Sequence, residues 1–262
     1  MTFRLRQIAV AVTDLEGALA DAEAIFGASH PYEDSGVARY KLRNAVYRFG
    51  DTFLELLTPV AGDTTVGRLL ARQEGDCGYM VILQTDRIEE ARSRVAKAGI
   101  RVVDQLDRNG CGFTHLHPRD VGGTLLSIDY MSRWTQWEWG GPGWESHAAP
   151  ACSIVAAEMH GPEPELMARR WSAVLGLPCS EHEGGWRIAL DGGELLFLSD
   201  SERRGEGLRA LAVLCAQPEA VLEQAAKRGR ASPDGGIRLW GMTVRVLGPA
   251  SKPPLHSAQT GE

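Results

Sequence analysis

Hydrophobic and polar positions follow a pattern that starts at the N-terminus and then recurs along the chain. A strand predicted over residues 5–12 runs directly into a helix predicted over residues 15–26. In the strand, Ile8 and Val10 share one face and Gln7 lies on the other, because side chains alternate across a strand. Apolar residues in the helix recur every three or four positions. This helix should therefore cover one face of the sheet.

Polar and glycine residues mark the ends of the predicted helices. Asp14 is placed to cap the first helix and Gly27 to end it. Asp86 and Gly99 occupy the same positions around a second helix, which carries the same apolar stripe. We expect both aspartates to act as helix caps.

The strand and helix pattern recurs four times, and in most copies further strands follow the helix. The first copy continues with strands 38–47 and 52–57, and the second has strand 79–83, helix 88–98 and strands 102–106, 112–117 and 123–130. The third has strand 153–157, helix 164–175 and strands 186–190 and 194–198. The fourth has strand 208–215, a helix ending at Gly229 and strands 237–240 and 242–247. A short helix is also expected over residues 66–72. The pattern predicts an α+β protein of four βαβββ modules.

The pattern is interrupted once, by a Trp- and Gly-rich segment that we interpret as a linker. This places a first domain at residues 1–131, the linker at 132–150, a second domain at 151–248 and a flexible tail at 249–262. The linker carries four tryptophans, which could form a binding surface. We expect them instead to pack the connector against its domains, since aromatic side chains bury large areas.

Composition narrows the class of protein. The 262 residues carry a net charge of −6 and show no basic patch, which argues against a nucleic-acid partner. The sequence shows no signal-peptide pattern and no apolar run long enough to span a membrane, so a cytoplasmic protein without a membrane partner is expected.

Five scattered cysteines without CxxC spacing are expected to be reduced. The usual nucleotide-binding glycine motifs and the GxSxG nucleophile motif do not occur.

Three stretches in the first half resemble one family. They are QIAVAVTDLEGAL, DTFLELLTP and HPRDVGGTLLSIDY, and they are similar to segments of methylmalonyl-CoA epimerases and glyoxalase-like proteins of the vicinal oxygen chelate superfamily. The resemblance implies two domains, each with two modules whose curved mixed sheets surround a cavity and carry helices outside. It also implies a divalent metal held by four side chains in the cavity.

In the first half, those four ligand positions fall on Gln7, Glu55, Met80 and Ser127, with Tyr79 as the alternative to Met80. Only Gln7 and Glu55 could still serve a hard or borderline cation, since methionine is a soft ligand and neutral serine a poor one. The usual ligand set is therefore incomplete. We expect no cofactor, and the alternative is a divalent metal bound by Gln7 and Glu55.

In the second half, the aligned positions fall on Ser153, Leu196, Leu211 and Arg245. This half should bind no metal at these positions. We interpret it as a degenerate copy that stabilises the first half or closes its cavity.

Glu55 is the leading catalytic candidate. Phe53, Glu55 and Leu57 share one strand face, so Glu55 points into the cavity if the alternate leucines pack under the helix. Enclosure by apolar walls would raise its pKa and suit it to remove a proton beside a carbonyl. The structural alternative is an ion pair with Arg48 or a solvated site at the cavity mouth.

Other cavity-facing groups are candidates for binding a ligand. They are Gln7, Phe53, Tyr79, Met80 and Ser127. His115 and His117 share a strand face and could chelate a metal, but the resemblance places them at a strand-to-turn junction rather than among the ligands.

Two functions of different classes follow from these candidates. The first is an isomerase, epimerase or lyase that transfers a proton on a small carbonyl compound or an acyl-CoA, and the polar pair Gln7 and Glu55 favours it slightly. The second is a binding protein of the bleomycin-resistance type, which encloses a small molecule without chemistry. An extradiol dioxygenase is the weakest candidate, because its two histidines and one glutamate around iron are missing. The expected partner is a small molecule, and a homodimer is compatible with the sequence.

Overall fold

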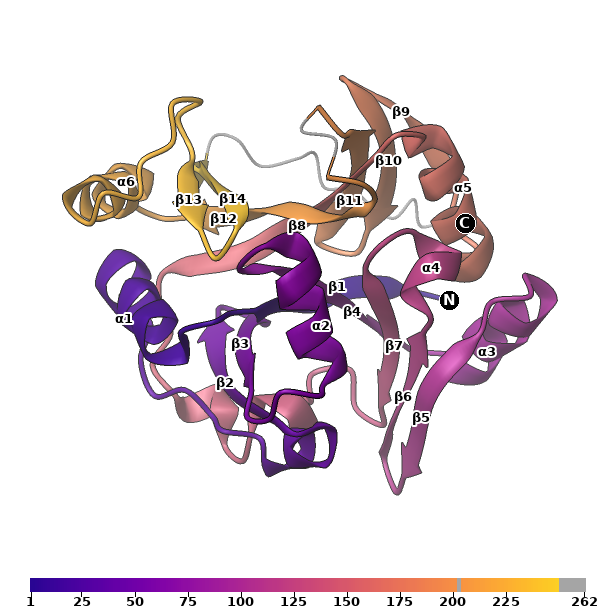
Figure 1. Cartoon of the computed structure of the whole chain (residues 1–262). Helices are drawn as coiled ribbons and strands as arrows, with labels where there is room; N and C mark the ends of the chain where they lie inside the picture. Colours follow the sequence, from indigo (N-terminus) through magenta and orange to yellow (C-terminus); the bar gives the residue numbers. More distant parts are fainter. Residues whose placement is uncertain (202–203, 250–262) are drawn as a thin grey trace, which may run out of the picture.

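The computed structural model describes residues 1–201 and 204–249 and contains two seven-stranded mixed sheets with helices outside (Figure 1). The first sheet has the order β2-β3-β1-β4-β7-β6-β5. Its strands are β1 (Phe3–Ala11), β2 (Leu42–Phe49), β3 (Thr52–Pro59), β4 (Cys77–Thr85), β5 (Val102–Arg108), β6 (Cys111–Leu116) and β7 (Leu125–Met131). The helices of this half are α1 (Leu15–Phe26), η1 (Ser35–Tyr40), α2 (Thr65–Gln73), α3 (Ile88–Lys97) and α4 (Pro118–Val121).

The second sheet repeats this plan with the order β13-β14-β12-β8-β11-β10-β9. Its strands are β8 (Cys152–Gly161), β9 (Cys179–His182), β10 (Gly185–Leu190), β11 (Gly193–Ser199), β12 (Gly207–Cys215), β13 (Ile237–Leu239) and β14 (Met242–Leu247), and its helices are α5 (Pro164–Leu175) and α6 (Pro218–Lys227). Two short 3-10 helices, η2 (Glu138–Gly140) and η3 (Trp144–Ser146), lie in the segment between the sheets. The predicted α+β class and the paired modules are confirmed.

The helix ends agree with the sequence patterns in one module and differ in another. The side chain of Asp14 accepts a hydrogen bond from the backbone of Gly17, and Gly27 adopts the left-handed conformation that ends α1. Asp86 does not cap α3, because the cap residue is Arg87 and Asp86 instead accepts a bond from the backbone of Thr2. The expected cap was wrong here because Thr2, the residue just before β1, brings a competing donor to the same carboxylate.

One predicted strand begins later than expected. The sequence placed it at residues 38–47, but residues 35–40 form η1 and the strand β2 begins at Leu42. Lys41 is left-handed, with φ of 58°, and separates the two elements. A single residue in this conformation is not visible in a hydrophobic pattern.

The convex faces of the two sheets pack against each other. One continuous apolar core includes Ile8 and Val81 of the first sheet and Ala157 and Leu211 of the second. Figure 1 shows α1 beside α6 and α3 near α5, so a pair of helices flanks each side of this contact. At Gly78 an added Cβ would lie 2.5 Å from the backbone oxygen of Leu208, so only glycine permits this approach. The concave faces of the two sheets therefore point away from each other.

Trp171 of α5 lies within the shared core and connects the two halves. Its side chain has no exposed area, and its indole donates a 2.8 Å hydrogen bond to the backbone oxygen of Val121 in α4. Its ring also meets Phe197 edge to face, with 5.6 Å between ring centroids. A residue of the second half thus completes the core of the first.

The cysteines differ from the sequence expectation. Cys152 and Cys215 form a disulfide between β8 and β12, whereas Cys77, Cys111 and Cys179 are free thiols. The reduced state expected for all five was wrong for this pair, because the two residues are register partners in antiparallel strands although 63 positions separate them in sequence.

Two further expectations concern the whole chain. Within residues 1–201 and 204–249, no helix is both long enough and apolar enough to cross a membrane. The predicted flexible tail lies, apart from Pro249, outside the described residues.

Candidate functional site

The candidate site lies on the concave face of the first sheet, where alternation brings the sequence-predicted residues together. Phe53 and Leu57 belong to the apolar cluster on this face, whereas Leu54 and Leu56 belong to the core shared with the second sheet. Glu55 therefore points to the concave side, as predicted. Gln7 occupies the neighbouring strand β1, where it is the register partner of Phe53.

Glu55 is buried and held by two amides. It is 6% exposed, and its Oε1 and Oε2 atoms accept hydrogen bonds from Asn44 Nδ2 at 2.6 Å and from Gln7 Nε2 at 2.8 Å. Burial raises the pKa of the carboxyl above its usual range, while the two donated hydrogen bonds oppose this rise. The alternative ion pair is wrong, because Arg48 donates to the backbone oxygens of Gly50, Glu145 and His147.

Tyr79 and Met80 both reach the concave face from β4. The pairing of β1 with β4 shifts register between Ala9 and Val10, which leaves Tyr79 as an extra residue beside Met80. Tyr79 is half-buried and Met80 is 7% exposed. Burial first, and the nearby Glu55 second, raise the pKa of the Tyr79 phenol well above its usual range. Tyr79 therefore carries its proton at neutral pH and can donate a hydrogen bond.

Ser127 on β7 belongs to a second polar cluster on this face. Its hydroxyl donates to Asp129 Oδ1, and Trp139 Nε1 donates to Asp129 Oδ2 at 2.6 Å. Asp129 is 2% exposed, and burial raises its pKa to about 7. Sequence reasoning missed Asp129, although strand alternation places it on the same face as Ser127.

Asn44 was also missed. It lies on β2 between Leu42 and Val46, whose side chains belong to the concave apolar cluster, and it is 2% exposed. A single amide between two apolar residues of the same strand face was the available signal. The structure gives that amide a partner in Glu55.

The segment between the halves forms one wall of the site. Trp137 is 1% exposed, and its indole donates a 2.8 Å hydrogen bond to Gln7 Oε1. Trp144 is 6% exposed and meets Phe53 edge to face. The prediction that these tryptophans pack against the domains is confirmed for these two residues. Trp137 also makes a polar contact that was not predicted.

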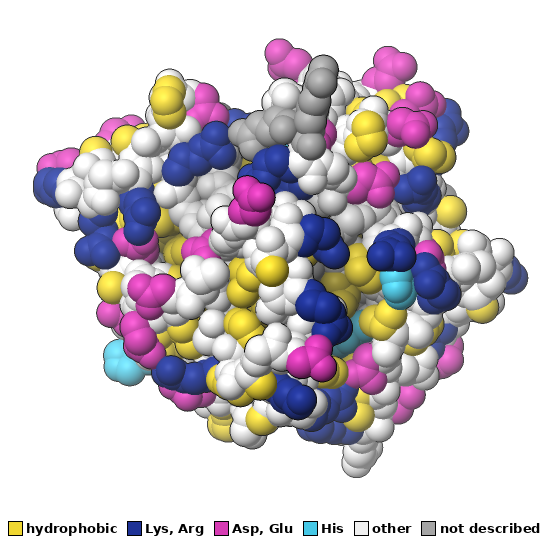
Figure 2. Space-filling view, viewed as in Figure 1, with side chains coloured by type: hydrophobic (Ala, Val, Ile, Leu, Met, Phe, Trp, Pro, Cys, Tyr) yellow, Lys and Arg dark blue, Asp and Glu magenta, His cyan; other side chains and the backbone are white. Residues whose placement is uncertain are grey.

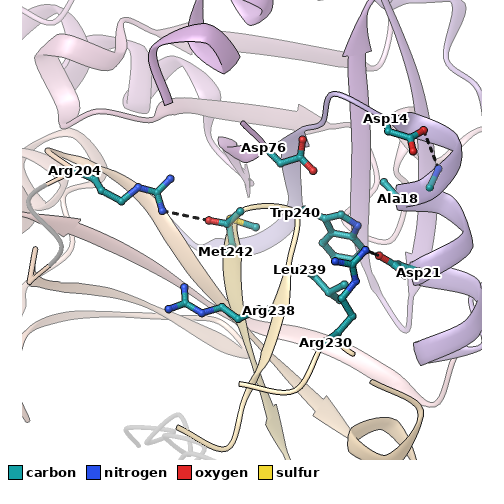
Figure 3. A pocket seen from close by; sticks show the side chains of 12 residues that line it. Asp14, Ala18, Asp21, Asp76, Arg204, Arg230, Arg238, Leu239, Trp240 and Met242 are labelled. Atoms are coloured by element: carbon teal, nitrogen blue, oxygen red, sulfur yellow. Dashed lines mark hydrogen bonds and ion pairs between the residues drawn. The ribbon is translucent and has the colours of Figure 1, made fainter. Parts of the chain in front are cut away.

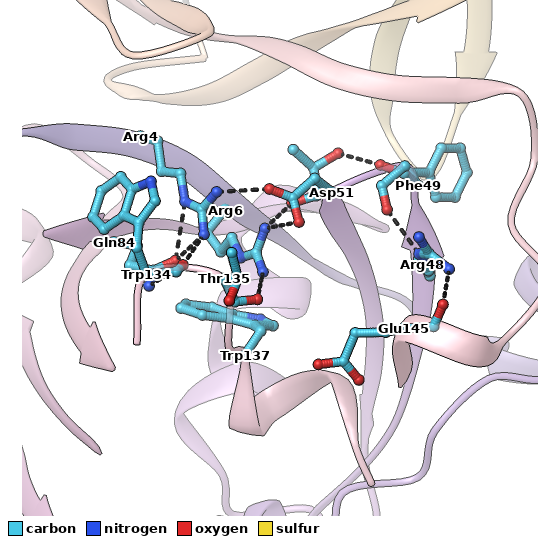
Figure 4. Close-up of polar contacts among 12 residues, drawn as sticks. Arg4, Arg6, Arg48, Phe49, Asp51, Gln84, Trp134, Thr135, Trp137 and Glu145 are labelled. Carbon is cyan, nitrogen blue, oxygen red and sulfur yellow. Dashed lines mark hydrogen bonds and ion pairs between the residues drawn. The ribbon is translucent and has the colours of Figure 1, made fainter. Parts of the chain in front are cut away.

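Three arginines of the first sheet hold this segment in place (Figure 4). Arg4 and Arg6 donate to the backbone oxygens of Trp134 and Thr135, and Arg48 donates to the backbone oxygens of Glu145 and His147. Asp51 pairs with both Arg4 and Arg6. These ties make the segment a fixed part of the first half.

Arg6 is fully buried under the aromatic side chains of the site. Its guanidinium carbon lies 5.3 Å from the ring centroid of Phe53, 5.4 Å from that of Trp137 and 5.2 Å from that of Trp144. Burial lowers its pKa to about 10, so it stays charged at neutral pH. The cation therefore attracts all three rings to one place.

The rim of the concave face consists of apolar side chains that are only partly buried. It is formed by half-buried side chains, namely Tyr32, Val37, Leu69, Tyr79, Leu125 and Trp139. Figure 2 shows hydrophobic side chains between α2 and β7, with Lys and Arg around them. The polar side chains of the site, Gln7 and Glu55, are more deeply buried than these apolar ones.

The residues at the four implied metal positions do not fit a divalent cation. Gln7 Oε1, the atom that could coordinate, accepts from Trp137, and both oxygens of Glu55 accept from amides. Ser127 donates to Asp129. Across residues 1–201 and 204–249, no three His, Cys, Asp or Glu side chains gather as a metal site. His115 stacks on Phe113 and His117 caps α4, so the two histidines do not form a site together.

We expect Mn²⁺, Co²⁺, Ni²⁺ or Zn²⁺ to leave the thermal unfolding midpoint of the protein unchanged, because the coordinating oxygens are already bonded to N–H groups. Differential scanning fluorimetry with and without each ion measures this directly. A rise in the midpoint that disappears in a Glu55→Ala variant would instead show that a cation displaces the amides.

The second sheet presents a different concave face. Leu196 occupies the position equivalent to Glu55, and its register partner Glu158 is paired with Arg245 at 2.5 Å. Leu211, one of the aligned positions, lies in the shared core and not on the concave side. The carboxylate of this half is thus neutralised by an arginine.

A cleft of about 420 Å³ lies elsewhere, between α1 and the β13–β14 hairpin. Figure 3 shows Arg204 and Arg238 on one side of it and Asp14 and Asp76 on the other. Asp21 in this cleft is paired with Arg230. The cleft contains none of the residues described above for the concave face.

Comparisons with known proteins agree with this architecture. A model of the glyoxalase-like domain family matches residues 8–175. Human mitochondrial methylmalonyl-CoA epimerase is 29% identical over 133 residues, which cover 48% of this chain and 73% of that protein. The ethylmalonyl-CoA/methylmalonyl-CoA epimerase of Cereibacter sphaeroides is 28% identical over 139 residues, covering 50% of this chain and all of that protein.

Two solved structures share the fold across most of the chain. A mutant of 4-hydroxymandelate synthase from Streptomyces coelicolor has a TM-score of 0.68 at 15% identity, covering 88% of this chain and 76% of its own. A hypothetical protein from Staphylococcus aureus has a TM-score of 0.66 at 12% identity, covering 95% of this chain and 100% of its own. With a family match over about two thirds of its length, the chain belongs to the glyoxalase-like domain family of the vicinal oxygen chelate superfamily.

Proposed function

We propose that the first half is an isomerase-type enzyme in which Glu55 moves a proton next to a carbonyl group of a small compound or acyl thioester. The observation that carries this proposal is the buried carboxylate of Glu55, held by two amides on a face with an apolar rim. A base in such surroundings has a pKa closer to neutrality than an exposed glutamate, which favours proton transfer. The epimerases similar to the first half support a substrate of this class.

The chemistry requires a base and a hydrogen-bond donor. Glu55 takes the proton as the C–H bond breaks, and the electron pair moves onto the carbonyl oxygen to form an enolate. Tyr79, which keeps its proton because its pKa is raised, donates a hydrogen bond to that oxygen. Solvent then delivers a proton to the opposite face of the carbon, which gives the isomer, and Glu55 releases to solvent the proton that it took.

Deuterium exchange in D2O tests this proposal even when the product of the reaction is unknown. The full-length protein is incubated with methylmalonyl-CoA and with a panel of small carbonyl compounds that carry an acidic C–H bond. Mass spectrometry then follows the gain of deuterium. We expect exchange into at least one compound, and a loss on the order of 100-fold in a Glu55→Gln variant, since positioned bases contribute about this much.

The control is Glu183→Gln, which changes an exposed glutamate of the second half. Circular dichroism shows whether each variant is folded, because the new amide at position 55 would face the donors of Asn44 and Gln7. Exchange that is equally fast in folded Glu55→Gln protein would contradict the assigned base.

A binding protein without chemistry is the second candidate, and the apolar rim favours it. Six half-buried aromatic and aliphatic side chains form this rim, which suits a hydrophobic or aromatic molecule. A compound that raises the unfolding midpoint but takes up no deuterium would support binding and contradict the enzyme proposal.

A further inference from the structure

A hydrogen-bonded chain links the segment between the two halves to Glu55. Trp137 Nε1 donates to Gln7 Oε1, and Gln7 Nε2 donates to Glu55 Oε2, each over 2.8 Å. The three residues are 1%, 3% and 6% exposed, so water does not compete for these bonds. The first and last of them are 82 positions apart in sequence.

We propose that Trp137 is a positioning residue for Glu55, which it orients through the amide of Gln7. An amide has an accepting end and a donating end, whereas an indole can only donate. The indole therefore binds the oxygen of Gln7 and leaves the NH2 group facing the carboxylate. This inference rests on the proposed role of Glu55 as the base.

The surroundings of Trp137 fix it in the position that this role requires. Its ring stacks on Phe53 with 6.3 Å between centroids, and the guanidinium of Arg6 lies over it. The backbone just before it is held through the carbonyl oxygens of Trp134 and Thr135. A donor held this firmly needs no rearrangement when a ligand arrives, which is what a preorganised site provides.

Loss of the indole N–H would release the amide of Gln7. The amide could then turn over and place its oxygen against Glu55, where it repels the carboxylate and accepts a hydrogen bond from the neutral acid. The base form of Glu55 would lose one of its two donors. We expect a roughly tenfold lower rate of exchange, with the Michaelis constant little changed.

Trp144 offers a matched control. It is buried at 6% exposure, touches the same Phe53 ring and lies over the same Arg6 cation. No described hydrogen bond joins it to Gln7. A role limited to packing would make Trp137→Phe and Trp144→Phe behave alike, whereas a positioning role separates them.

The experiment compares the two phenylalanine variants in the full chain labelled with 15N glutamine. The side-chain NH2 signals of Gln7, assigned by their disappearance in Gln7→Leu, report the orientation of the amide without any ligand. We expect these signals to shift or broaden in Trp137→Phe and to stay in place in Trp144→Phe. Equal changes in both variants, or none in either, would overturn the proposal.

Exchange into methylmalonyl-CoA, or into whichever compound of the panel the wild type labels, provides the second readout. We expect Trp137→Phe to lower kcat about tenfold with KM within about twofold, and Trp144→Phe to lower kcat much less. If no compound exchanges but the Gln7 signals still move, the positioning stands and the proposed function fails. If Glu55 proves essential and the signals do not move, the function stands and the positioning fails.

Discussion

Replacing Asp129 with asparagine should make the protein more stable at pH 8 and leave its stability nearly unchanged at pH 4. Asp129 is almost completely buried, and its pKa is raised to about 7. At pH 8 the native protein therefore holds a buried negative charge. Asparagine removes that charge, and its amide can accept from Trp139 while donating to the hydroxyl of Ser127.

The direction of the pH dependence follows from proton linkage. Between about pH 4 and pH 7 the native state keeps a proton on Asp129 that the unfolded chain has lost, so stability falls as the pH rises through this range. The contribution of Asp129 to the free energy of unfolding is fully present below the pKa that Asp129 has in the unfolded chain. It is lost once the pH passes the pKa that Asp129 has in the native state. A pKa rise from about 4 to about 7 corresponds to about 4 kcal/mol of unfolding free energy.

Urea unfolding of the wild type and Asp129→Asn at pH 4, 5, 6, 7 and 8 measures the difference in free energy. We expect it to grow with pH to as much as about 4 kcal/mol and then to level off above pH 7. Asp63→Asn, which changes a carboxylate with 90% of its side chain exposed, should give no comparable trend. A difference that is constant with pH would show that Asp129 does not carry a raised pKa.

Replacing Trp171 with alanine should cost about 3 to 5 kcal/mol of unfolding free energy, as for other large core aromatics. The ring is fully buried against Phe197, and its N–H binds the backbone of Val121 across the contact between the halves. Trp171→Phe keeps most of the apolar contact and loses the hydrogen bond. It should cost less than the alanine variant.

Urea unfolding followed by far-ultraviolet and near-ultraviolet circular dichroism tests this second prediction. Because one core serves both sheets, both signals should change in a single transition in the wild type and in both variants. Leu166→Ala changes a 41% exposed residue of the same helix and should cost no more than about 0.5 kcal/mol. Two separate transitions, or a small effect of Trp171→Ala, would show that the halves fold independently.

The periodic features of this protein were predictable from sequence. Strand alternation placed Glu55 on the concave face and Leu54 in the core, because that rule depends only on neighbouring positions. Ser127 was identified through the family resemblance. The strand and helix repeats likewise gave the α+β modules. These predictions depended on local patterns and on no distant contact.

Contacts between distant segments were not predictable. The bond from Trp137 to Gln7 joins residues 130 positions apart, and its segment has no regular period. The disulfide of Cys152 depends on which residues become register partners. The cap expected at Asp86 failed because the backbone of Thr2, just before β1, donates to this carboxylate. In each case the contact depends on how segments that are distant in sequence pack together.

The back-to-back arrangement of the two sheets also affects how this protein can evolve. A substitution at the convex core must suit both halves at once, since residues such as Trp171 serve each of them. A substitution on either concave face affects only one half. After a duplication, selection can therefore remodel one cavity while the other is conserved. The carboxylate of Glu55 and the apolar side chain of its counterpart Leu196 are an example of such divergence.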